Sequence, residues 1–95
     1  MTLTSLFHRK FYADVERNVV TGRRFGDDHT FYCWLGVLTE ELGKLARAAN
    51  KLNIAEDADV RAEWSKEGYH RLLTLCAVSR RMAEKWPEIV QHRGE

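Results

Sequence analysis

Four glutamates of this 95-residue chain, Glu40, Glu41, Glu63 and Glu67, have the type and spacing that suit metal chemistry. Mg²⁺ prefers carboxylate oxygens together with the phosphates of a substrate. If two antiparallel helices both turn acidic side chains inward, the carboxylates form a cage around such an ion. The ion would neutralise a polyphosphate and activate water for its hydrolysis. We therefore take Glu41 and Glu67 as candidate catalytic residues, and Glu41, Glu67 and Glu63 as candidate Mg²⁺ ligands.

The segment from Phe31 to Leu52 must position Glu41. At about 100° per residue its large apolar side chains fall on one stripe, which we expect to be a buried helix face. Glu41 falls roughly 60° from the centre of the stripe and Lys44 about 120° from it, on a ridge at its border, whereas Glu40 points to solvent. The expected stripe is Phe31, Trp34, Leu35, Leu38, Leu42, Leu45, Ala49 and Leu52, and the ridge is Glu41, Lys44, Ala48 and Lys51.

The same charges have a simpler interpretation. Lys44 follows Glu41 by three residues and Glu40 by four, and opposite charges at these spacings pair on a helix surface for about 0.2–0.5 kcal/mol each. Glu63, Glu67 and His70 alone are typical of a solvated helix face. Local sequence leaves the metal site and the surface ion pairs both open.

Two further helices are predicted, near residues 3–20 and 57–86. Apolar residues recur every fourth position in the first. In the second they cluster around Leu72, with Arg81 on the opposite, polar side. Pro87 is expected to end this helix and leave residues 87–95 as a tail that either docks or frays. The candidate N-caps of the three helices are Thr2, Thr4, Asp27, Asp28, Thr30, Asp57 and Asp59.

Length and composition predict one small all-α domain, an antiparallel bundle of three main helices spanning residues 1–95. Bulky aromatic residues exceed what one thin layer buries, so we expect oligomerisation, most simply a two-fold homodimer, to complete the bundle. The formal net charge of +1, without long runs of like charge, predicts no nucleic-acid partner. The chain has neither an apolar run that would span a membrane nor a signal sequence, so we expect a cytoplasmic protein. Cys33 and Cys76 lack metal-ligand spacing and are expected to be reduced core residues.

A resemblance runs from about Val15 to Trp86, which is most of the chain, and four stretches carry it: VER, RRFGDDH, WLGVLTEELGK and EGYHRLLTLCAVSRRMAE. With these stretches the chain resembles the MazG-like, all-α nucleoside triphosphate pyrophosphohydrolases. In that family E-E-x-x-E on one helix and E-x-x-D on the next bind Mg²⁺ at a nucleotide pocket. Glu40 and Glu41 match the first two positions, and Glu67 matches the first position of the second motif. The resemblance implies Mg²⁺-dependent hydrolysis of a nucleoside triphosphate to the monophosphate and pyrophosphate.

Two positions depart from the family pattern. Lys44 stands where the third glutamate is expected, and His70 stands where the aspartate is expected. Lysine binds phosphate as a point charge, so Lys44, together with His70 and Lys51, is a candidate for nucleotide contact. Three interpretations stay open: an active enzyme, a nucleotide binder that uses Lys44, and a catalytically silent helical interaction module.

Overall fold

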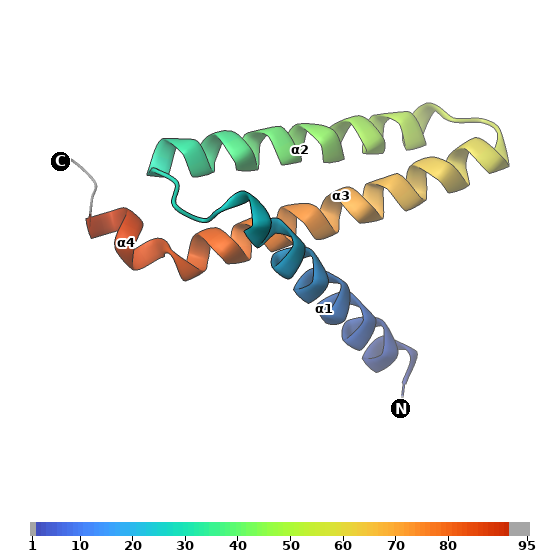
Figure 1. The fold of residues 1–95 in the computed structure, drawn as a ribbon. Coiled ribbons are helices and arrows are strands. Elements are labelled where there is room, and N and C mark those ends of the chain that lie inside the picture. The colour runs from blue at the N-terminus through green and yellow to red at the C-terminus, as the bar shows by residue number, and fades with distance from the viewer. Residues whose placement is uncertain (1, 92–95) are drawn as a thin grey trace.

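The computed structural model describes residues 2–91, and within them it contains helices and no strands, which confirms the predicted all-α class. Two long helices, α2 and α3, form an antiparallel hairpin (Figure 1). Helix α1 crosses α3 obliquely, and its N-terminal end points away from the hairpin. The elements are α1 (Leu3–Gly22), the single 3-10 turn η1 (Arg23–Phe25), α2 (Phe31–Ile54), α3 (Ala58–Glu84) and the short α4 (Trp86–Gln91).

Each of the three long helices begins after a residue whose side chain caps it. Thr2, Thr30 and Asp57 accept hydrogen bonds from backbone N–H groups two or three residues further on. These bonds satisfy donors that have no acceptor within the helix. The helices therefore begin within one residue of their predicted starts.

The end of the third helix differs from the prediction. Helix α3 ends at Glu84, and Pro87 lies in the first turn of α4, where its missing N–H breaks no helical hydrogen bond. Ile89 of α4 is buried against Trp34 and Val78, so this part of the expected tail is a docked helix. Residues 92–95 of that tail lie outside the described part of the chain.

The core consists of two clusters, and α3 contributes to both. One cluster joins α1 to α3, and the other joins α2 to α3 and α4. Trp34 is fully buried in the second. Since α3 packs against both neighbours, it organises the fold. The first cluster contains Val15, Val19, Leu73 and Ala77, and the second contains Trp34, Val78 and Ile89.

The face of α2 that packs on α3 is rotated from the predicted stripe. Ala48, assigned to the polar ridge, is buried, and the Glu41 side chain is only 12% exposed, whereas Leu42 is 55% exposed. A Cβ atom at Gly68 of α3 would lie 3.8 Å from the Cβ of Ala48. Because these two small residues let the backbones approach closely, the contact centres on Ala48 rather than on the larger leucines.

The predicted stripe of α3 is also displaced. Leu72, its expected centre, is exposed, whereas Arg81, expected on the solvated side, is buried.

The expectation that both cysteines are core residues is wrong for Cys33. Cys33 is exposed at the start of α2, while Cys76 packs against the first cluster. Within residues 2–91 no helix has the length and apolar character needed to cross a membrane.

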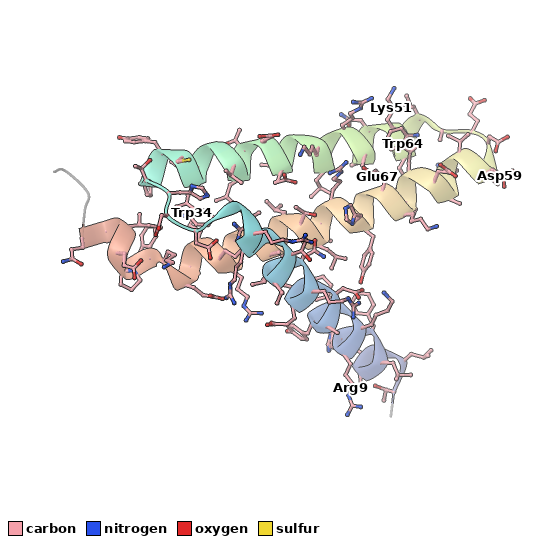
Figure 2. The ribbon with its side chains drawn as sticks, in the orientation of Figure 1. Arg9, Trp34, Lys51, Asp59, Trp64 and Glu67 are labelled. Atoms are coloured by element: carbon pink, nitrogen blue, oxygen red, sulfur yellow. The ribbon has the colours of Figure 1, made fainter. Side chains whose placement is uncertain are left out.

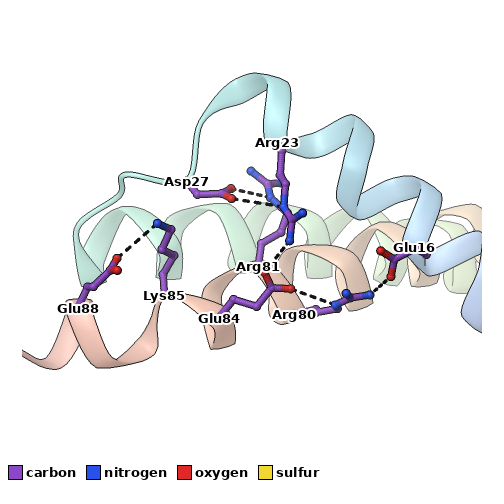
Figure 3. Close-up of polar contacts among 8 residues, drawn as sticks. All are labelled: Glu16, Arg23, Asp27, Arg80, Arg81, Glu84, Lys85 and Glu88. Atoms are coloured by element: carbon purple, nitrogen blue, oxygen red, sulfur yellow. Dashed lines mark hydrogen bonds and ion pairs between the residues drawn. The ribbon is translucent and has the colours of Figure 1, made fainter.

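Ion pairs fasten the loop before α2 to α3 (Figure 3). The buried Arg81 guanidinium donates to Asp27 Oδ1 at 2.9 Å and to the Gly26 carbonyl at 3.1 Å. It also lies over the ring of Trp34, 5.6 Å from the ring centre. A Cβ atom at Gly22 would come within 2.5 Å of this guanidinium, so any side chain at position 22 would displace Arg81.

A buried carboxylate links α1 to α3. Asp14 accepts hydrogen bonds from Lys10 at 2.6 Å, from the Tyr69 hydroxyl at 3.0 Å and from Arg17. The bond from Lys10 is the main cause that lowers the pKa of Asp14 below its ordinary value. The ionised carboxylate therefore stabilises the fold.

Acid should weaken this link at Asp14. The lowered pKa means that the stability contributed by the carboxylate is complete above its ordinary pKa of about 3.9 and is lost as the pH falls through the lowered value. We expect Asp14→Asn to flatten the decline of unfolding free energy below about pH 4, measured by urea unfolding at each pH. Asp28→Asn, in an exposed loop position, is the control. A decline as steep in Asp14→Asn as in the unaltered chain would contradict this role.

Candidate functional site

A cavity of about 800 Å³ lies between α2 and α3, toward the loop that joins them. This volume lies within the range of roughly 300–1,000 Å³ that is common for small-molecule sites. Figure 2 shows Trp64 and Glu67 on the part of α3 that faces α2, and Asp59 near the loop. The wall consists of Lys44 and Arg47 from α2, and Asp59, Val60, Glu63, Trp64, Glu67 and Arg71 from α3.

The charges of this wall follow from helical spacing. Asp59, Glu63 and Glu67 recur every fourth residue, so they form one ridge along α3. Lys44 and Arg47 are three residues apart on α2 and line the same cavity. With Arg71, the wall holds three basic and three acidic side chains. It is therefore rich in charge but formally neutral.

Glu67 and Arg71 form an ion pair along α3. Arg71 Nε donates to Glu67 Oε1 at 2.7 Å. A guanidinium carries five N–H donors in a fixed fork, so this bond uses one and orients the others. The pair therefore holds a positioned arginine in the cavity wall.

Lys44 is held by both glutamates of the acidic pair. Its Nζ lies 3.1 Å from Glu41 Oε1 and 3.5 Å from Glu40 Oε1, so the predicted ion pairs are present. The hydrogen bond to Glu41 is the main cause that raises the pKa of Lys44. The other Glu41 oxygen, Oε2, is buried and has no hydrogen-bond partner. Such an oxygen is costly to bury without a donor or a cation.

As arranged here, the candidate metal ligands do not fit Mg²⁺. Within residues 2–91 no three His, Cys, Asp or Glu side chains lie close enough together to hold a metal ion. Glu63 and Glu67 line the cavity, but Glu41 does not. One oxygen of Glu41 and one of Glu67 already accept hydrogen bonds from cationic side chains. We therefore derive no chemical step through a metal ion, and the Mg²⁺ site stays a prediction.

The cavity brings together only part of the predicted site. Lys44, Glu63 and Glu67 line it, whereas His70 and Lys51 are exposed outside its wall. Sequence reasoning missed further wall residues. The sequence does contain a signal for part of this wall. A charged residue occupies every fourth position from 59 to 71, and this spacing predicts one polar ridge along the helix. The wall residues missed are Arg47, Asp59, Val60, Trp64 and Arg71.

Comparison with known proteins adds no family to this geometry. No family model, curated protein or solved structure matches the chain. We therefore infer the function from the cavity and from the residues of its wall.

Proposed function

We propose that the cavity between α2 and α3 binds a nucleotide. The observation that supports this most directly is that three cationic side chains and an indole share one cavity wall. Lysine and arginine are the side chains that bind phosphate, and the arginine fork does so with two parallel hydrogen bonds. Aromatic rings stack on nucleobases, which contributes about 1–3 kcal/mol per base. The MazG-like resemblance of the sequence leads to the same class of ligand.

Each wall residue has a role in this proposal. Lys44, Arg47 and Arg71 contact the phosphates, and Trp64 stacks on the base. The acidic ridge accepts hydrogen bonds from the sugar hydroxyls or from amino groups of the base. Because the ridge balances the cations, phosphate alone gains little net attraction in the cavity. A ligand with both phosphates and donor groups is favoured, so a nucleoside triphosphate should bind more tightly than inorganic triphosphate.

Titration with nucleotides tests the proposal directly. We expect calorimetry in the presence of EDTA to detect binding within a panel of ribo- and deoxyribonucleoside triphosphates, and the ligand to quench the fluorescence of Trp64. Lys44→Ala should weaken this metal-free binding by about 10-fold or more, since hydrogen bonds to charged groups contribute about 1.5–3 kcal/mol. Trp64→Phe should remove the fluorescence change.

Lys66→Ala is the matched control for Lys44→Ala. Lys66 is an exposed lysine of α3 outside the cavity wall, so its loss should leave affinity unchanged. If Lys66→Ala and Lys44→Ala weaken binding equally, the effect is a general loss of positive charge and not a phosphate contact. If no nucleotide binds, the proposal is wrong, and the alternative of a catalytically silent interaction module gains support.

Hydrolysis of the bound nucleotide is the second candidate function. It is favoured by the position of Glu63 and Glu67 in the same wall as the cations. The MazG-like resemblance implies release of pyrophosphate with Mg²⁺ as cofactor. An assay of pyrophosphate release, with Mg²⁺ and with Mn²⁺ across the same nucleotide panel, separates an enzyme from a binder.

The proposal also includes self-association of the chain as a homodimer.

A further inference from the structure

The α2–α3 hairpin has two chemically different sides. One side holds the charged cavity. The other, here called the apolar side, consists of Leu35, Leu38 and Leu42 from α2 and Leu72, Ala83 and Trp86 from the α3 and α4 segment.

The apolar side carries large side chains that no other part of residues 2–91 covers. Leu35, Leu42, Leu72 and Trp86 are between 39% and 55% exposed. At their centre Leu38, Ala83 and Trp86 line a hollow of about 330 Å³. Along this side of α2, no charged residue occurs at the helically spaced positions 31, 35, 38, 42, 46 and 49. Charged residues are depleted in the same way at the centres of protein interfaces.

The surface area of the whole chain points to a second copy. The accessible area is 7153 Å², whereas the scaling for compact monomers predicts about 5,700 Å² for a chain of this mass. The radius of gyration is 16.0 Å, against about 12.4 Å for a compact domain of this length. Part of the excess of roughly 1,500 Å² belongs to the projecting α1. In size the excess is comparable to the area that each partner buries in an obligate homodimer, whose interfaces total about 2,000–5,000 Å².

We infer that the apolar side pairs with the same surface of a second copy. Face-to-face contact through a two-fold axis uses one self-complementary patch and closes the assembly at two chains. The two hairpins then form a four-helix layer with the leucines and Trp86 in its centre. The cavity wall shares no residue with this contact, so the inference does not depend on nucleotide binding.

Light scattering and sedimentation equilibrium over a range of micromolar concentrations test the contact. The unaltered chain should have twice the 11.1 kDa mass of one copy. Leu42→Arg and Leu72→Arg should each raise the dissociation constant of the dimer at least 100-fold, because both copies carry the substitution at a two-fold contact. Leu42 is already more than half exposed in the single chain, so its replacement tests association without disturbing the core. Circular dichroism should show the helix content retained in Leu42→Arg.

Ile54→Arg is the matched control. Ile54 is a large exposed residue at the far end of α2, outside the apolar side, so its replacement should leave the dimer intact. A chain that stays monomeric throughout the concentration range would overturn the inference. A dimer that survives both leucine variants but dissociates with Phe7→Arg would also overturn it, and would place the contact on the projecting part of α1.

Discussion

Replacing Arg81 by alanine is expected to lower the melting temperature of the chain by more than about 10 °C. The substitution leaves the Asp27 carboxylate, which is mostly covered, without its main partner, and it removes the cation above Trp34. Loss of one partner of a buried ion pair costs about 3–5 kcal/mol. In a domain of this size each kcal/mol corresponds to about 4–8 °C. Thermal unfolding followed by circular dichroism gives the value.

The neighbouring residue supplies a control for Arg81. Arg80 bonds to Glu16 and Glu84, but it is 44% exposed (Figure 3). Exposed pairs contribute about 0–1 kcal/mol, so Arg80→Ala should change the melting temperature by only a few degrees. Arg81→Lys should fall between the two, because lysine keeps the charge but cannot donate to Asp27 and Gly26 with the same fork. Equal shifts in Arg80→Ala and Arg81→Ala would show that burial of Arg81 adds no stability.

Lys44→Glu should convert the acidic pair into a Mg²⁺ site. The substitution removes an ammonium 3.1 Å from Glu41 Oε1 and places three carboxylates at positions 40, 41 and 44. A change of two charge units at this distance is worth several kcal/mol at the effective dielectric of a protein surface, so we expect Mg²⁺ affinity to rise by roughly 100-fold. Metal-free nucleotide binding should fall. Calorimetry measures both affinities, and pyrophosphate release shows whether hydrolysis rises with them.

The control for Lys44→Glu is Lys66→Glu, which makes the same change of charge at an exposed position outside the cavity wall. It should leave both affinities close to those of the unaltered chain. If Lys44→Glu leaves Mg²⁺ affinity unchanged, or if the unaltered chain already binds Mg²⁺ as tightly, then Lys44 is only the ion-pair partner of Glu40 and Glu41.

The helices were predictable because their signals are local. Side-chain caps such as Thr30 and Asp57 act within one turn, and apolar periodicity fixes the type of element. The rotation of each helix about its axis was not predictable in this way. It depends on which partner residues are small enough to permit close approach, as Ala48 and Gly68 are across the hairpin. The burial of Arg81 was not predictable either, because its partners Asp27 and Gly26 lie in the loop before α2, far from Arg81 in sequence.

The candidate site was predictable only in part for a related reason. Lys44, Glu63 and Glu67 were selected for their chemistry and lie in one cavity wall. Arg47 and Trp64 belong to no motif. They line the cavity because α2 and α3 are rotated about their axes relative to the orientations that the apolar pattern predicted. Glu41 was expected at the border of the buried stripe, but it lies near the centre of the α2 face that packs on α3, where one of its oxygens is buried.

The oblique attachment of α1 predicts the order in which the chain folds and opens. Helices α2 and α3 are joined by residues 55–57 alone, so their contact closes a very short loop at small entropic cost. Helix α1 can dock only on a surface of α3 that already exists, and its buried residues begin at Asp14. We therefore expect the hairpin to form first during folding and α1 to dock on it afterwards. In the native state we expect the reverse order, in which the first turns of α1 exchange their amide hydrogens through local fraying while the hairpin remains closed.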